Sequence, residues 1–265
     1  MKFKRWFKDI VVLINELYIK LQKDNKDVEV LHQYRINLRK LYAYIEVYTK
    51  NINEKKSKKL SKLIKSIMKP TAFCRDLDLF LIEIDKMNLD ILIKEKLHTI
   101  FDSQKEKNNK KFLHLLKSSK YKKKLNTLSL IAKNNKSFIY DMQNINQYKI
   151  IKKKKNDLFK KINKINLNSL PKDFHNTRKE FKKFRYALNI YDEFFKKNKK
   201  EFCEKSNLKE ILEALGNIQD NYIRLNFIKS AKQEFTKIQE RDLETHFKIK
   251  ILKAKLRLLK AKRIL

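Results

Sequence analysis

Apolar residues recur every three or four positions through almost the whole chain, which is the spacing of one face of an α-helix. Asn, Ser and Pro clusters interrupt this pattern. The pattern predicts helices at residues 5–23, 28–52, 54–68, 70–87, 90–118, 120–133, 147–165, 172–197, 207–236 and 239–263. Asp27 and Asp173 are expected to cap helices and Pro171 to open one. We therefore expect an all-α protein, with the polar stretch 134–147 as its linker.

The amino-acid composition excludes several classes of protein. One Gly and two Pro among 265 residues leave little material for hairpin turns or glycine-rich phosphate loops. Lys and Arg total 66 against 30 Asp and Glu, a net charge of +36, while 42% hydrophobic residues suffice for a folded core. The longest run without a charged residue or His is 125–132, too short to cross a bilayer. These numbers predict a basic globular protein with no membrane span.

Candidate chemistry is sparse outside the basic residues. Cys74 and Cys203 lie far apart and match no metal or redox spacing, which suits reduced thiols in a cytosolic protein. Asp76, Asp78 and Asp220 have no accompanying His or second acidic cluster. We expect no metal site, no cofactor and no catalytic residues.

A short basic motif occurs twice, 143 residues apart. It reads His-x2-Arg-x3-Arg-Lys in the first copy and His-x2-Arg-x3-Lys-Lys in the second. The residues are His32, Arg35, Arg39 and Lys40, then His175, Arg178, Lys182 and Lys183. Apolar positions repeat in register between the copies, and Arg75-Asp76 recurs as Gln219-Asp220 at an offset of 144. The repeat predicts two duplicated helical bundles, residues 1–140 and 141–265.

Each motif places its cations on one side of a helix. At 100° per residue, the first copy spans an arc of about 60° and the second, with Arg185, about 80°. Apolar residues occupy the opposite side and predict packing into a bundle core. No carboxylate lies within either stripe, and Arg is concentrated there in a chain that otherwise prefers Lys. Because the planar Arg fork grips phosphate or carboxylate oxygens, the stripes indicate anion binding, with a solvated helix face as the alternative.

These motifs, together with Arg75-Asp76-x-Asp78 and Leu215-Gly216-x2-Gln219-Asp220, resemble the CHAD family, the histidine-containing α-helical domain. The resemblance covers essentially the full chain. It implies two antiparallel helical bundles related by a pseudo-twofold, with motif helices around a groove that binds inorganic polyphosphate, and association with polyphosphate granules. Tyr42 stands where the family usually has another Arg, and Thr71-Ala72 replaces Leu-Gly. The first half is therefore expected to bind less tightly.

On this interpretation one set of residues contacts polyphosphate: His32, Arg35, Arg39, Lys40, His175, Arg178, Lys179, Lys182, Lys183 and Arg185. Asp76 and Asp220 are expected to hold motif side chains in place. The two histidines are either ligand contacts or structural residues. The protein would be a non-enzymatic binding module or adaptor, cytoplasmic and located on polyphosphate granules.

Two other function classes stay open. The charge alone would suit a nucleic-acid or ribosome-associated protein, but Tyr48, Phe181, Phe184 and Tyr191 fall on the core arc, where they cannot stack bases; only Tyr42 shares an arc with a stripe. A phosphohydrolase or phosphotransferase would need metal-holding carboxylates or an activated nucleophile beside the stripes. The basic and apolar segment 247–265 is expected to be the last bundle helix, the alternative being a segment that lies on an anionic membrane or RNA.

Overall fold

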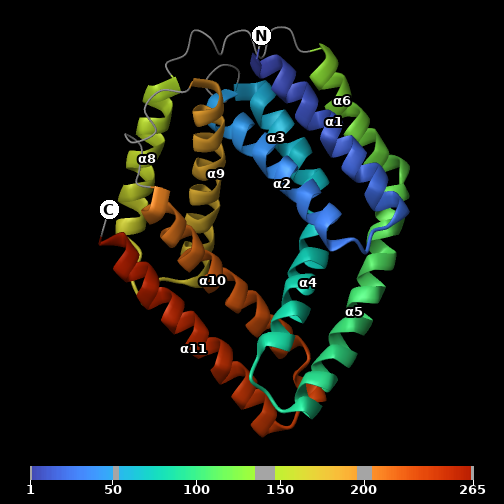
Figure 1. The fold of residues 1–265 in the computed structure, drawn as a ribbon, viewed down its shortest axis with the longest axis vertical. Coiled ribbons are helices and arrows are strands. Elements are labelled where there is room, and N and C mark those ends of the chain that lie inside the picture. The colour runs from blue at the N-terminus through green and yellow to red at the C-terminus, as the bar shows by residue number, and fades with distance from the viewer. Residues whose placement is uncertain (1, 50–53, 135–146, 196–204, 264–265) are drawn as a thin grey trace. The chain divides into compact units, whose positions relative to one another are not determined.

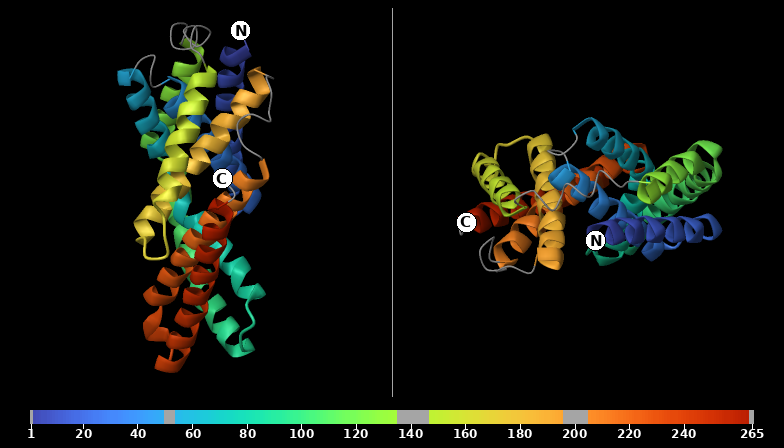
Figure 2. Two further views of the ribbon diagram at one scale, coloured as in Figure 1. Left: turned by 90° about the vertical axis from the view of Figure 1, so that its left-hand side faces the viewer. Right: turned by 90° about the horizontal axis from the view of Figure 1, so that it is seen from above.

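The computed structural model describes residues 2–49, 54–134, 147–195 and 205–263 (Figures 1 and 2). This part of the chain forms ten α-helices and no β-strand, which confirms the all-α prediction. The chain divides into a first compact unit, Met1–Ile145, and a second, Asn146–Leu265. The expected boundary at 140/141, almost all of the expected linker, and Cys203 lie outside the described residues. Within the described ranges, no helix combines the length and apolar character needed to span a bilayer.

Six helices form the described part of the first unit. They are α1 (Lys2–Lys23), α2 (Val28–Tyr44), α3 (Glu54–Met68), α4 (Thr71–Lys86), α5 (Ile91–Lys117) and α6 (Ser119–Asn134). α1 packs against α2 and α6, whereas α4 packs against α5 and α2 (Figure 1). Phe7, Leu38, Phe80 and Phe101 are completely buried between these helices. The apolar face read from the sequence therefore becomes the core of this unit.

A buried chain of hydroxyl groups ties three helices of the first unit together. The Tyr121 hydroxyl donates to the Ile67 carbonyl at 2.8 Å and lies 3.0 Å from the Tyr34 hydroxyl. Because Tyr121 uses its proton on Ile67, Tyr34 is the donor in the second bond. Burial raises the pKa of both phenols. The two bonds satisfy polar groups that would otherwise be costly to bury.

Four helices form the described part of the second unit. They are α8 (Gln147–Asn163), α9 (Pro171–Phe195), α10 (Lys205–Ser230) and α11 (Lys237–Lys262). α9 packs against α8 on one side and α10 on another, and α10 and α11 pair along their length (Figures 1 and 2). Phe174, Phe181 and Phe184 of α9 are buried, as the sequence pattern predicts.

Most helix ends lie within three residues of the predicted ones, but two differ. The predicted helix 28–52 changes after Tyr44 into a π-helical turn, Ile45–Thr49. The predicted helix 207–236 stops at Ser230, whose hydroxyl donates to the Phe227 carbonyl and occupies one of the last acceptors of the helix. A 3₁₀ turn, Lys232–Glu234, then leads into α11. Apolar periodicity continues through both breaks and therefore could not locate them.

The predicted caps are correct at one helix and wrong at the other. Asp27 caps α2, accepting hydrogen bonds from the backbone amides of Glu29 and Val30. Pro171 opens α9 as expected. Asp173 lies inside the first turn of α9, and its carboxylate reaches back to accept a hydrogen bond from the Leu170 amide at 3.2 Å. It therefore supplies the returning half of a capping box rather than the cap itself.

Candidate functional site

The motif helix of the second unit, α9, presents its cations away from the core. We define the α9 stripe as His175, Arg178, Lys179, Lys182 and Arg185. His175, Arg178 and Lys182 are half-buried, whereas Lys179 and Arg185 are exposed. The buried phenylalanines of α9 fix the rotation of the helix about its axis. The stripe is therefore held at the surface by the packing of the opposite face.

Side chains of α10 contact His175 and Arg178 of the α9 stripe. Gly216, Gln219 and Asp220 have the i, i+3, i+4 spacing of one helix face. His175 Nδ1 lies 2.9 Å from Gln219 Oε1, and Arg178 Nη2 donates to Asp220 Oδ1 at 3.2 Å. The contact between Asp220 and a motif cation that the sequence suggested is thus present. It anchors one edge of the guanidinium in a defined orientation.

Gly216, the one glycine of the chain, lies directly beside this guanidinium. A Cβ atom at this position would stand 3.9 Å from both Nε and Nη2 of Arg178. The guanidinium therefore lies against the bare backbone of α10, with Gln219 and Asp220 one turn further along. A Cβ at this distance would make ordinary van der Waals contact, so the packing of Arg178 does not by itself require glycine here.

A shallow cavity of about 300 Å³ continues the site between α9 and α10. Its charged lining residues are Lys182 and Arg185 from α9, and Lys209 and Glu213 from α10. Glu213 accepts a hydrogen bond from Arg257 of α11 at 3.0 Å, and its other carboxylate oxygen is 3.9 Å from Lys209 Nζ. Three cations against one ion-paired carboxylate make this cavity suited to an anion.

Lys183 takes a different direction from the α9 stripe. Its ammonium donates to Glu180 Oε1 at 2.7 Å, and Lys154 of α8 donates to Glu180 Oε2 at 2.7 Å. Burial by itself raises the pKa of the Glu180 carboxyl, but the hydrogen bonds and charges of the two lysines outweigh burial and lower its pKa to about 2. The sequence grouped Lys183 with its neighbours, whereas the structure joins it to α8 through Glu180.

The motif helix of the first unit, α2, carries the α2 stripe of His32, Arg35, Arg39 and Lys40. Arg35 is only 5% exposed, which corrects the expectation of a fully exposed stripe. Its Nη1 donates at 2.5 Å to the Thr71 hydroxyl, which in turn donates to the Met68 carbonyl. The reason lies in α4, which packs against α2 and brings Thr71 over the guanidinium. His32, Arg39 and Lys40 remain half-buried.

Burial lowers the pKa values of two members of the α2 stripe. Burial, reinforced by the neighbouring charges of Arg39 and Arg75, lowers the pKa of Arg35 to about 10, although the Asp76 carboxylate opposes the shift. Arg35 therefore stays charged at pH 7. Burial also lowers the pKa of His32, an effect that Arg75 and Arg39 reinforce and Glu29 partly opposes. His32 is accordingly a neutral imidazole near pH 7 and becomes a cation only in acid.

Five aromatic side chains that bear on nucleic-acid binding lie in the core. Tyr48, Phe181, Phe184 and Tyr191 are buried, as expected. Tyr42, which was expected to share the surface of the α2 stripe, is also buried, and the Lys65 ammonium lies 5.0 Å from its ring centroid. These five rings therefore present no stacking platform for bases beside the cations.

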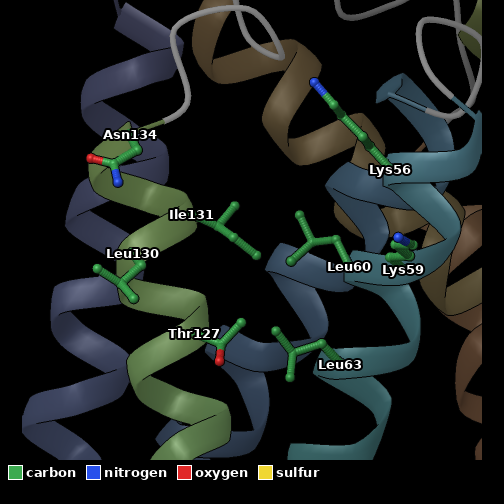
Figure 3. A pocket seen from close by; sticks show the side chains of 8 residues that line it. All are labelled: Lys56, Lys59, Leu60, Leu63, Thr127, Leu130, Ile131 and Asn134. Atoms are coloured by element: carbon green, nitrogen blue, oxygen red, sulfur yellow. The ribbon is translucent and has the colours of Figure 1, made fainter.

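Two further features lie apart from the stripes. A groove of about 560 Å³ between α3 and α6 is lined by Leu60, Leu63 and Ile131, among others, and by no predicted site residue (Figure 3).

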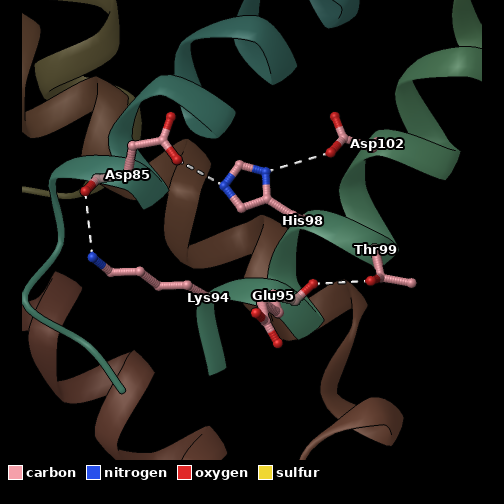
Figure 4. Close-up of polar contacts among 6 residues, drawn as sticks. All are labelled: Asp85, Lys94, Glu95, His98, Thr99 and Asp102. Carbon is pink, nitrogen blue, oxygen red and sulfur yellow. Dashed lines mark hydrogen bonds and ion pairs between the residues drawn. The ribbon is translucent and has the colours of Figure 1, made fainter. Parts of the chain in front are cut away.

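His98 of α5 lies between two carboxylates, 2.8 Å from Asp85 and 3.4 Å from Asp102 (Figure 4). The i, i+4 spacing of His98 and Asp102 is visible in the sequence, whereas the contact with Asp85 depends on the packing of α4 against α5.

Asp78 is likewise engaged within the fold. It is buried, and the ammonium of Lys105 on α5 lies 2.9 Å from its carboxylate. Within the part of the chain that the structure describes, no group of three or more His, Cys, Asp or Glu side chains is arranged to hold a metal ion. Cys74 is buried as a free thiol, and burial raises its pKa to about 11.

The fold resembles solved structures of known proteins. The structure of PptA from Streptomyces chartreusis superposes with a TM-score of 0.73, at 12% sequence identity over 96% of both chains. The CHAD domain from the plant Ricinus communis superposes with a TM-score of 0.72, at 15% identity over 98% of this chain and 89% of that one. No curated protein sequence matches. A sequence model of the CHAD domain matches residues 16–229, and the chain therefore belongs to the CHAD domain family.

Proposed function

We propose that this protein binds inorganic polyphosphate through the α9 and α2 stripes without transforming it. The observation that carries the proposal is the arrangement on α9 and α10. There Arg178 is anchored by Asp220 against Gly216, and Lys182 and Arg185 continue into a cationic cavity. Membership of the CHAD domain family supports the same ligand.

The geometry of the α9 stripe suits a linear polyanion. Arg178 and Arg185 lie seven residues apart, which is roughly 10 Å along the helix axis. Their cations form a row rather than a cluster, so successive phosphates of an extended chain can each meet one cation. Each contact is a charge-assisted hydrogen bond, and binding releases counterions from the polyanion. The affinity is therefore expected to fall steeply as salt rises.

The structure suggests two kinds of role within the predicted set. His175, Arg178, Lys179, Lys182 and Arg185 in the second unit donate directly to phosphate oxygens. His32, Arg39 and Lys40 do so in the first unit.

Arg35 and Lys183 add positive charge from positions held by Thr71 and Glu180. Asp220 orients Arg178, and Asp76 compensates the buried charge of Arg35. Because one member of the α2 stripe is buried, the α9 stripe is the stronger half.

We also propose that the two units descend from one duplicated bundle. In each unit the motif helix packs against a helix that carries an Arg-Asp or Gln-Asp pair, α4 in the first and α10 in the second. The equivalent arginines contact adjacent positions of the repeat: Arg35 donates to Thr71, and Arg178 lies beside Gly216, which corresponds to Ala72. Through these two stripes the protein would be located on polyphosphate granules in the cytoplasm, as an adaptor.

Binding is preferred to catalysis because the acids nearest the α9 stripe are engaged. Asp220 is bonded to Arg178, and Glu213 to Arg257, so neither is placed as a general base. Prolonged incubation with polyphosphate and Mg²⁺ or Mn²⁺ is expected to release no phosphate. Turnover that Asp220→Asn abolishes would overturn this part of the proposal.

Binding to nucleic acid is the second candidate, and a competition experiment separates the two. Labelled long-chain polyphosphate is bound to the full chain, and unlabelled single-stranded RNA is added at matched phosphate concentration. Because Tyr42, Tyr48, Phe181, Phe184 and Tyr191 are buried, these rings give RNA no stacking energy, and RNA should displace polyphosphate only at a large excess. Displacement at equal or lower phosphate concentration would contradict the proposal and favour an RNA-binding function.

A further inference from the structure

The last helix, α11, has apolar side chains on two opposite faces. One face is buried in the second unit, through Leu243, Phe247, Ile251, Ala254 and Leu258. The other face consists of Ile249, Leu252, Leu256 and Leu259, which we define as the α11 outer seam. Ile249 is 47% exposed, Leu252 50% and Leu256 50%. A bundle helix needs only one apolar face, so the fold of this unit does not account for the second one.

The spacing of the outer seam is that of a coiled coil. Its residues are separated by three, four and three positions, so they occupy positions a, d, a and d of a heptad. Asp242 and Arg263 fall on the next a positions and end the seam on either side. At 100° per residue, Ile249, Leu252 and Leu256 span only about 60° of the helix circumference. This narrow strip fits the groove of one partner helix.

Lysine fills every flanking position of these heptads. The e positions are Lys253 and Lys260, and the g positions are Lys248, Lys255 and Lys262. Within α11 no acidic residue follows Glu244, and Glu244 itself pairs with Lys248 at 2.6 Å. Residues at e and g decide which helix a coiled coil accepts.

The two flanks of the outer seam differ in accessibility. On the g flank, Lys255 donates to the Leu167 carbonyl at 2.7 Å and Lys262 donates to the Ile165 carbonyl at 2.5 Å. Both lysines are thus directed to the loop between α8 and α9. On the e flank, Lys253 and Lys260 are exposed. A partner would therefore meet its main electrostatic contacts at Lys253 and Lys260.

We propose that the α11 outer seam binds an acidic amphipathic helix of a partner protein. The apolar a and d residues of that helix pack on Ile249, Leu252 and Leu256, and its carboxylates pair with Lys253 and Lys260. A second copy of this chain is disfavoured because lysine would face lysine at every flanking position. A lipid surface is disfavoured because membrane-bound helices present a broader apolar face. The inference goes beyond polyphosphate binding and would let a bound chain recruit a helical partner.

The test uses a designed probe and the full-length protein. The probe is a fluorescein-labelled, four-heptad peptide with Ile at a, Leu at d and Glu at e and g. One control peptide has the same composition in scrambled order, and a second has Lys at e and g. Binding is followed by fluorescence anisotropy in about 0.3 M salt, which screens unspecific attraction to the basic surface. The heptad peptide should bind at least about tenfold more tightly than either control.

Two double substitutions test whether the peptide binds at the outer seam. The double substitution Leu252→Ser, Leu256→Ser should lower the affinity for the acidic peptide at least about tenfold, because two apolar contacts are lost. Leu130→Ser serves as the matched control, since Leu130 is 58% exposed on α6. Lys253→Glu with Lys260→Glu should reverse the preference toward the lysine peptide. Circular dichroism checks that each variant keeps its helicity.

Four results would each overturn the proposal. The first is equal affinity for the heptad and scrambled peptides. The second is peptide binding that survives the double serine substitution. The third is sedimentation of the wild-type protein as a dimer and of the double serine variant as a monomer. The seam would then bind a second copy of this chain. The fourth is seam-dependent binding to phosphatidylglycerol vesicles without any peptide preference, which would assign the seam to a lipid surface.

Discussion

Glu180 joins α8 to α9 and allows a quantitative test of the second unit. Its carboxylate accepts hydrogen bonds from Lys154 and Lys183, both at 2.7 Å, and its side chain is 24% exposed. The two lysines hold the pKa of the carboxyl at about 2, against an ordinary value of 4.5, although burial opposes the shift. Glu180→Gln keeps the shape of the side chain and removes its charge.

The size and pH range of the effect follow from this pKa. A carboxyl whose pKa is lower in the folded than in the unfolded protein stabilises the fold fully above the unfolded value of 4.5. The stabilisation is lost as the pH falls through the folded value of about 2. At about 1.4 kcal/mol per pKa unit, the charge contributes about 3 kcal/mol at pH 7 and about 1.4 kcal/mol at pH 3. Because Gln retains one acceptor, we expect Glu180→Gln to cost about 2–3 kcal/mol at pH 7.

Urea unfolding followed by circular dichroism measures this cost for wild type and variant at pH 7 and pH 3. Glu193→Gln is the matched control, because Glu193 is an exposed acid on the same helix, and it should change the unfolding midpoint little. The difference between wild type and Glu180→Gln should shrink by about half at pH 3. An equal difference at both pH values would show that the effect comes from packing and not from the charge of Glu180.

The remaining predictions concern the two stripes. Arg178→Ala with Arg185→Ala should weaken polyphosphate binding at least about tenfold while helicity and thermal stability stay near wild type; loss of the fold would instead assign these residues a structural role. Arg35→Ala should lower the free energy of unfolding by about 1–3 kcal/mol in urea titrations, because it removes a buried hydrogen bond, whereas Arg39→Ala should mainly weaken binding. Gly216→Ala should raise stability by about 0.5–1 kcal/mol without weakening binding, because the added methyl group finds ordinary contact distances; a large loss of affinity would mean that phosphate approaches the α10 backbone.

Local patterns in the sequence were sufficient for the helices and for part of the site. Apolar periodicity predicted each helix, and the Asp27 cap followed from local chemistry. The repeat also identified Asp220 as a partner for a motif cation, and the structure has this pair with Arg178. These features depend on residues close in sequence or on spacing repeated between the halves. Both are visible in the chain itself.

Burial of individual cations depends on contacts between helices and was not predictable. Arg35 and Arg178 are equivalent in the repeat. Thr71 lies over Arg35, which is buried, whereas Arg178 lies beside Gly216 and is only half-buried. A helix drawn in isolation treats the two arginines alike. Lys183 is an intermediate case, because Glu180 three residues earlier was a visible signal for an ion pair. That Lys154 of α8 completes this ion pair required the packing of α8 on α9.

The most direct test of the central claim is calorimetric titration of the full-length protein with polyphosphate of defined length at two salt concentrations. We expect saturable binding whose log K falls, for each tenfold rise in salt, by about 0.7 per neutralised phosphate, which amounts to about 6 for eight contacts. Binding should also be strongly reduced in the Arg178→Ala, Arg185→Ala variant. Absence of saturable binding, or equal affinity in that variant, would contradict the claim that the basic stripes are a polyphosphate site.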